Sequence, residues 1–119
     1  MEWAKCGDLF SLLKECRLKK NLFFQNGESC LRFILGSVIL GLEDLHRKNI
    51  VYFDLKLENV LIFEDGYAKL GDFGLAREVA KGDSIIYRHG TPIYFSPQVA
   101  FGLKCTRAVD LWAVGILAF

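Results

Sequence analysis

The stretch from Val51 to Leu61 constrains this chain most, because it places several polar side chains between two apolar segments. A carboxylate (Asp54), an ammonium (Lys56) and an amide (Asn59) fall within it, after a helix-like apolar run and before a strand-like one. A second acidic tripeptide, Asp72-Phe73-Gly74, follows on the far side of an expected hairpin. We therefore expect a site in which these polar groups come together.

Length and composition limit the chain to one domain or part of one. It has 119 residues, of which 52 % are apolar, and folding at this length buries roughly two-thirds of the unfolded surface. The net charge of +1 gives no argument for a nucleic-acid partner or an anionic membrane. Some of the abundant apolar surface is expected to need a partner.

The cysteines, the uncharged runs and the N-terminal residues together bear on where the protein is located. The four cysteines form no C-x-x-C pair and no histidines cluster near them, so neither a zinc site nor a disulfide framework is expected. The longest uncharged runs, 33–42 and 111–119, are shorter than the ~18 residues that span a bilayer. Residues 1–20 mix acids and bases and are unlike a signal peptide. We expect no membrane span and a cytoplasmic or nuclear location.

The pattern of apolar residues predicts a mainly helical fold with one β-hairpin. Asp8 is a good N-cap for a short helix, and Ser29 for a long helix that runs from Leu31 to Arg47. The stretch 60–70 alternates around a turn at Gly66 and predicts a hairpin lying on that helix. Residues 75–98 contain both prolines and predict a long irregular segment, after which an apolar helix resumes.

The polar groups of the opening stretch suit phosphoryl transfer. Asn59 and Asp72 offer the oxygen ligands that Mg²⁺ prefers, and Mg²⁺ is usually held by one or two carboxylates plus phosphates. Asp54 is then available to accept a proton from an attacking hydroxyl, and Lys56 to neutralise charge on the transferred group. Asp72-Phe73-Gly74 alone is a weak motif, because Asp-Gly turns are common. Asp54-Leu55-Lys56 alone is also weak, because such a tripeptide is more often a solvated loop.

Five motifs in order resemble the eukaryotic protein kinase family, over essentially the whole chain. Residues 52–59 resemble the catalytic loop H-R-D-L-K-x-x-N, residues 72–74 are D-F-G, and residues 96–98 resemble A-P-E. Residues 90–94 resemble the segment G-T-x-x-Y, and residues 110–115 resemble the start of the buried helix that follows it. The resemblance implies the mainly helical C-terminal lobe of a kinase domain, with its catalytic hairpin.

The resemblance implies a role for each matching residue. Asp54 matches the catalytic base, Lys56 the contact to the γ-phosphate of ATP, and Thr91 the threonine that hydrogen-bonds in the catalytic loop. Asn59 and Asp72 match the Mg²⁺ ligands. The implied reaction is transfer of the ATP γ-phosphoryl group to a serine or threonine hydroxyl of a protein.

The resemblance also implies where ATP binds. Met1 to Ala4 resembles the hinge, so that backbone groups of Glu2 and Ala4 would meet adenine. Asp8 resembles the ribose contact, and Leu61 a residue that packs beneath the base. The N-terminal lobe of such a domain would pack on residues 1–10 and on the catalytic hairpin.

Details of the catalytic loop most resemble the basophilic AGC group of serine/threonine kinases. These details are Tyr52 in place of histidine and the sequence of residues 56–59. The resemblance implies that Asp8 and Glu58 face basic residues of the protein substrate. It also implies that Asp110 ties down the backbone of the catalytic loop.

Three departures from the family pattern stand out. Phe53 replaces the arginine that grips a phosphorylated activation loop, and Tyr87 stands where the AGC group carries its phosphorylated threonine. The hypothesis is that the usual loop phosphorylation does not control this chain. Gln98 replaces the A-P-E glutamate, and residues 1–119 contain no glycine-rich loop and no V-A-I-K lysine.

Residues 1–119 are therefore predicted to be a partial kinase domain, cut at the hinge and inside the buried helix, because the chain begins without a capping residue and stops in an apolar run. We expect an enzyme by family but no activity from the isolated chain. The alternative is a pseudokinase or truncated product that binds partners without catalysis, which Phe53 and Gln98 favour.

Overall fold

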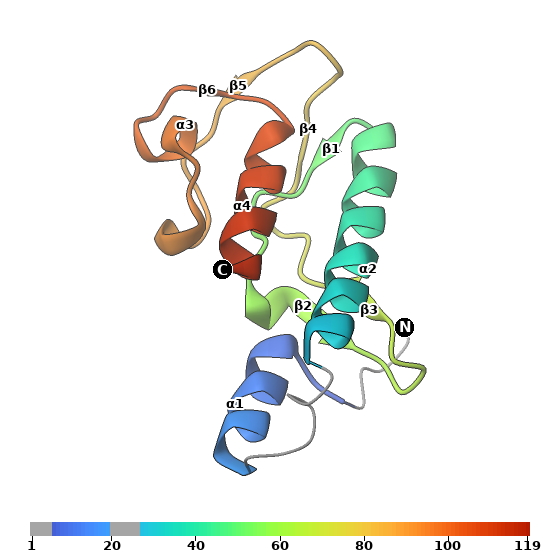
Figure 1. Ribbon diagram of the computed structural model, residues 1–119. Helices are drawn as coiled ribbons and strands as arrows, with labels where there is room; N and C mark the ends of the chain where they lie inside the picture. The colour runs from blue at the N-terminus through green and yellow to red at the C-terminus, as the bar shows by residue number, and fades with distance from the viewer. Residues whose placement is uncertain (1–5, 20–26) are drawn as a thin grey trace.

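The computed structural model describes residues 6–19 and 27–119 (Figure 1). The helices are α1 (Leu9–Lys19), α2 (Gly27–Arg47), α3 (Pro97–Ala100) and α4 (Ala108–Ala118), with single 3₁₀ turns at Leu57–Asn59 and Pro92–Tyr94. The strands are β1 (Ile50–Val51), β2 (Val60–Ile62), β3 (Ala68–Leu70), β4 (Arg77–Glu78), β5 (Ile85–Ile86) and β6 (Lys104–Cys105). The predicted mainly helical fold with a hairpin is confirmed.

Helix α1 begins as predicted, with Asp8 as its N-cap. The backbone N–H of Ser11 donates to Asp8 Oδ1 at 2.8 Å, and the Ser11 hydroxyl donates to Oδ2 at 3.2 Å. These contacts satisfy one of the amide groups that the first turn of a helix leaves without an internal partner. Asp8 thereby fixes the direction in which the chain enters the helix.

Helix α2 begins earlier than the sequence indicated. It starts at Gly27, so the prediction that Ser29 is its N-cap is wrong, while its predicted end at Arg47 is confirmed. Glu28 stabilises the added turn, because an acid is favourable near a helix N-terminus and its carboxylate pairs with Arg32 at 2.6 Å.

The hairpin formed by β2 and β3 lies on α2, as predicted. Its strands pair antiparallel with Val60 opposite Leu70 and Ile62 opposite Ala68. Gly66 supplies the positive φ of +85° that the turn requires. Because the buried side chains of both strands share one apolar cluster with the inward face of α2, the hairpin does not depend on its own two strands for stability.

Figure 1 shows α4 beside α2, with α1 at one end of the molecule and α3, β5 and β6 at the other. A first apolar cluster joins α1, α2, the hairpin and α4. A second joins β1 and the catalytic loop to the segment 79–109, through Val51, Phe53, Val79, Val99, Cys105 and Val109. The segment predicted to be irregular contains β4 and β5, which pair with β1 and β6 over two residues each. No helix in the described ranges is long and apolar enough to cross a bilayer.

Candidate active site

The catalytic loop between β1 and β2 is anchored from below by Asp110 of α4. This carboxylate is almost fully buried and accepts hydrogen bonds from the backbone N–H groups of Tyr52 at 2.8 Å and Phe53 at 2.9 Å. His46 of α2 lies 2.8 Å from the same carboxylate. The backbone of Phe53 is left-handed, with φ of +64°, a conformation that costs a non-glycine residue roughly 1–2 kcal/mol. The two hydrogen bonds from Asp110 hold the loop in this shape.

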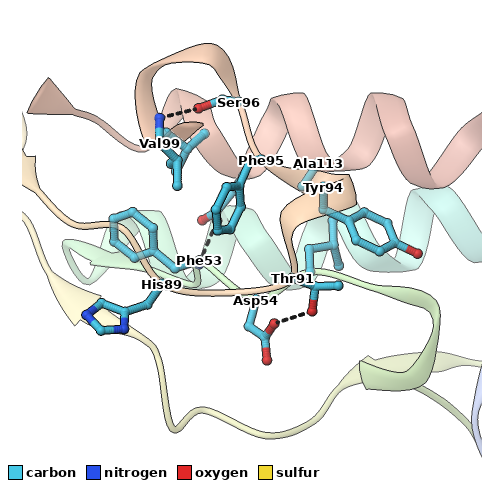
Figure 2. Close-up of a pocket in the computed structure, with 12 residues that line it drawn as sticks. Phe53, Asp54, His89, Thr91, Tyr94, Phe95, Ser96, Val99 and Ala113 are labelled. Carbon is cyan, nitrogen blue, oxygen red and sulfur yellow. Dashed lines mark hydrogen bonds between the residues drawn. The ribbon is translucent and has the colours of Figure 1, made fainter. Parts of the chain in front are cut away.

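Three of the predicted catalytic side chains, Asp54, Lys56 and Thr91, meet at this loop, and Figure 2 shows two of them, Asp54 and Thr91. Lys56 Nζ lies 3.3 Å from Asp54 Oδ2 and 3.4 Å from Thr91 Oγ1. The Thr91 hydroxyl, from the segment that follows β5, donates to Asp54 Oδ1 at 3.5 Å. Asp54 is 7 % exposed, so its carboxylate is shielded by protein and held between an ammonium and a hydroxyl.

Asn59 is oriented by Asp54 rather than by solvent. Its amide nitrogen donates to the Asp54 backbone carbonyl at 2.8 Å and to Asp54 Oδ2 at 3.0 Å. Both amide hydrogens are used in this way, which leaves the amide oxygen as the atom that can face a cation. The orientation therefore suits the predicted role of Asn59 as a ligand to a hard metal ion.

Asp72 is brought to this site through Gly71. The Gly71 N–H donates to the Asn59 carbonyl at 2.9 Å, and the Tyr52 hydroxyl donates to the Gly71 carbonyl. Asp72 itself is exposed, has φ of +50°, and accepts a hydrogen bond from the Gly74 N–H at 3.1 Å. The side chains of Asn59 and Asp72 offer oxygen donors, which fit Mg²⁺. In the described part of the chain no cluster of three or more histidine, cysteine or acidic side chains forms a competing metal site.

Tyr52 links the two motifs and stays protonated. Burial raises the pKa of its phenol above the ordinary value, and the negative charges of Asp54 and Asp72 raise it further. The neutral hydroxyl can therefore keep donating to Gly71, while the Tyr52 ring contacts Phe73 edge-on at 5.5 Å between centroids. Tyr52 thus connects the catalytic loop to Gly71 and Phe73, the residues on either side of Asp72.

Of the residues predicted to bind nucleotide, two are brought together and two cannot be compared. Asp8 and Leu61 form an antiparallel bridge, supported by the Ile62 N–H, which donates to the Gly7 carbonyl at 2.9 Å. Glu2 and Ala4 lie outside the described residues. Because both oxygens of Asp8 contact Ser11, this carboxylate already has a structural role in α1.

Some contacts of the site were not anticipated from the sequence. His46 contacts Asp110 and its carbonyl accepts a hydrogen bond from Arg107, although the two partners are more than sixty residues away. The Tyr94 hydroxyl accepts a hydrogen bond from the Leu57 N–H at 3.3 Å. A polar residue at a buried helical position, such as His46 one residue after Leu45, is a signal that could have prompted a search for a partner.

Comparison with known proteins places this geometry in a family. The protein kinase domain matches residues 1–119, the whole of the chain. The chain belongs to the protein kinase family. The fold and the family expected from the five motifs are thus confirmed.

Its relatives include serine/threonine kinases of the AGC group. The chain is 41 % identical to the serine/threonine-protein kinase akt-2 of Caenorhabditis elegans, over all of this chain and 21 % of that protein. It is 40 % identical to the cAMP-dependent protein kinase catalytic subunit of Dictyostelium discoideum, over 99 % of this chain and 17 % of that protein. It is 49 % identical to the cGMP-dependent protein kinase egl-4 of Caenorhabditis briggsae, over 71 % of this chain and 11 % of that protein. The chain therefore spans about a fifth or less of the length of these curated relatives.

Proposed function

We propose that residues 1–119 form part of the C-terminal lobe of a serine/threonine kinase domain, which transfers the γ-phosphoryl group of ATP to a protein hydroxyl. The observation that supports this most is the meeting of Asp54, Lys56 and Thr91 within 3.5 Å of one another. Family membership supports protein substrates and ATP, with Mg²⁺ as the usual metal.

In the proposed reaction, Asp54 accepts the proton of the attacking serine or threonine hydroxyl. Thr91 contacts one oxygen of this carboxylate and Asn59 the other, so the two side chains fix its orientation. The Lys56 ammonium stabilises charge on the transferred group. Asn59 and Asp72 would hold Mg²⁺, which when bound neutralises charge on the phosphates of ATP.

The proposed nucleotide contacts are Asp8 and Leu61, with Glu2 and Ala4 at the adenine. We further propose that the N-terminal lobe packs on residues 1–10 and on the hairpin. The substrate is proposed to carry basic residues near its target hydroxyl. Two acids support this: Glu58 of the catalytic loop is exposed, and Asp8 pairs with Leu61 in the adjoining strand β2. Action in the cytoplasm or nucleus is proposed as well, and a fluorescent fusion in cells would test it.

A chimera tests the function. The 119 residues replace the matching segment of a relative such as the akt-2 kinase, and phosphate transfer to a basic serine peptide is measured with Mg²⁺. Transfer is expected from the chimera, with a loss of about a hundredfold or more in Asp54→Asn and in Asp72→Asn. The isolated chain is expected to transfer none, because its sequence supplies no glycine-rich loop and no V-A-I-K lysine.

The second candidate is a non-catalytic binding module. Large apolar side chains are exposed on the outer faces of α2 and α4, among them Leu40 at 64 %, Leu111 at 57 % and Trp112 at 45 %. Surface of this kind often contacts another protein or domain. A chimera that binds ATP and Mg²⁺ but transfers no phosphate would favour this candidate over the kinase.

A further inference from the structure

Residues 75–98, which we call the activation segment, contact the catalytic loop through aromatic rings. The rings of Phe53 and Tyr87 lie 4.7 Å apart between centroids, and the rings of Tyr87 and His89 lie 4.6 Å apart. The guanidinium carbon of Arg77 lies over the Tyr87 ring at 4.9 Å. We call these four residues the aromatic clamp. They come from the catalytic loop, β4 and the segment that follows β5, so the clamp joins three parts of the chain.

The clamp lies next to the proposed catalytic residues. Phe53 immediately precedes Asp54, and Tyr87 is four residues before Thr91. Between them, Gly90 passes so close to the loop that a Cβ atom there would lie 2.8 Å from the Phe53 carbonyl oxygen. Segment 87–91 therefore rests on residues 53–54 at both ends, through the ring pair at one end and through Thr91 and Asp54 at the other.

The surroundings of Tyr87 select a ring and not a charge. Tyr87 packs against the second apolar cluster, which includes Phe53 and Val79. Its hydroxyl is buried and has no hydrogen-bond partner within the described ranges. Arg77, the cation of the clamp, donates to the carbonyl oxygens of Ala76 and Gly74 while its guanidinium faces the ring. An aromatic pair of this kind contributes roughly as much as an exposed ion pair without requiring charge.

We propose that Phe53 and Tyr87 are positioning residues, which hold segment 87–91 on the catalytic loop and help to keep Thr91 at Asp54 through the contact of their rings. In this arrangement an uncharged pair performs the task of a phosphate and an arginine. The proposal concerns the packing of the chain, so its test reads packing and is independent of whether phosphate is transferred.

Hydrogen exchange measured by mass spectrometry on the full chain tests the ring contacts. Tyr87→Leu is expected to speed exchange in residues 84–91 by about three- to tenfold, the loss expected for one aromatic pair, while β2 and β3 exchange as before. Tyr87→Phe keeps the ring and is expected to exchange no faster than the unaltered chain. The matched control is Tyr67→Leu, which removes the separate aromatic pair of Tyr67 with Phe33 and leaves residues 84–91 unaffected.

Two outcomes would overturn the proposal. Exchange in Tyr87→Phe as fast as in Tyr87→Leu would assign the effect to the hydroxyl. Equal acceleration of β2, β3 and residues 84–91 would make Tyr87 part of general stability, with no local hold on the segment.

A double-mutant cycle gives an independent test of contact between positions 53 and 87. Phe53→Arg alone and Tyr87→Glu alone are each expected to speed exchange in residues 84–91, because each removes one ring of the aromatic pair. The double variant is expected to recover at least half of the lost protection, because the two charges can pair across the same gap. Additive effects in the double variant would overturn the proposed contact between positions 53 and 87.

Discussion

The catalytic loop is held on two sides by different chemistry. On one side the buried carboxylate of Asp110 contacts two backbone N–H groups and His46 at 2.8–2.9 Å. On the other side the Phe53 ring contacts Tyr87, whose hydroxyl has no hydrogen-bond partner among the described residues. Directional hydrogen bonds specify one backbone conformation, whereas ring contacts tolerate small displacements. The difference suggests a rigid loop and a more easily displaced activation segment.

Replacement of Asp110 is expected to have the largest effect on this comparison. Asp110→Ala leaves two backbone N–H groups buried without an acceptor and should lower the free energy of unfolding by about 3–5 kcal/mol. Urea denaturation followed by circular dichroism would measure the loss. Asp110→Asn is the matched control, since it keeps one acceptor oxygen and should lose less. A loss below about 1 kcal/mol in Asp110→Ala would contradict the anchoring role.

Gly90→Ala is the corresponding change on the activation-segment side, with a smaller expected effect. Gly90 has φ of +116°, and an added Cβ would lie 2.8 Å from the Phe53 carbonyl oxygen, so a loss of about 1–3 kcal/mol is expected. Gly82→Ala is the matched control, because Gly82 has φ of +89° but nothing lies within 4 Å of an added Cβ. If both variants lose equally, the cost comes from the backbone angle and not from contact with the loop.

Alkaline pH tests Tyr52, whose backbone N–H donates to Asp110 and whose neighbour Phe53 contacts Tyr87. Because its folded pKa is raised, the unfolded chain loses the phenolic proton first, so stability is intact below pH ~10 and falls as pH rises further. This one group should lower the free energy of unfolding by about 1.4 kcal/mol for each pH unit above that point. Tyr52→Phe should flatten the decline, whereas Tyr67→Phe, at an exposed ring, should leave it unchanged. An identical decline in Tyr52→Phe would contradict this reasoning.

The smallest expected effect lies outside both sides and supplies a baseline. Gly36 is within α2, and an added Cβ would have no neighbour within 4 Å. Gly36→Ala should therefore raise the free energy of unfolding by roughly 1 kcal/mol through helix propensity alone. The thermal midpoint would measure it, with no change expected in hydrogen exchange at residues 84–91. A lower midpoint would contradict the open space that the structure has around Gly36.

The sequence predicted the parts of the molecule that local patterns determine. The helical spacing in α2, the alternation around Gly66 and the order of the motifs each depend on residues close in sequence. The Asp110 anchor was also expected, but only because the family resemblance implied it. The roles assigned to Asp54, Lys56, Asn59, Asp72 and Thr91 remain predictions.

The remaining features depend on residues that are distant in sequence. The contact between His46 and Asp110 joins positions 64 apart, and no local pattern pairs them. Strands β4 and β5 are two residues long, too short to show alternation. The departures at Phe53 and Tyr87 were visible in the sequence, yet their ring contact appears only once the segment folds back on the loop. In α2, the pairing of Glu28 with Arg32 helps the helix begin before the capping signal at Ser29.

The Asp110 anchor also has a consequence for the order of folding. Its bonds to Tyr52 and Phe53 close loops of 58 and 57 residues, so entropy delays them relative to the local contacts of α2 and of the hairpin. We therefore expect the left-handed turn of the catalytic loop to become stable only once α4 has docked and Asp110 reaches it. On a ribosome, the residues proposed to do the chemistry would therefore emerge before α4 and reach their working arrangement only after it.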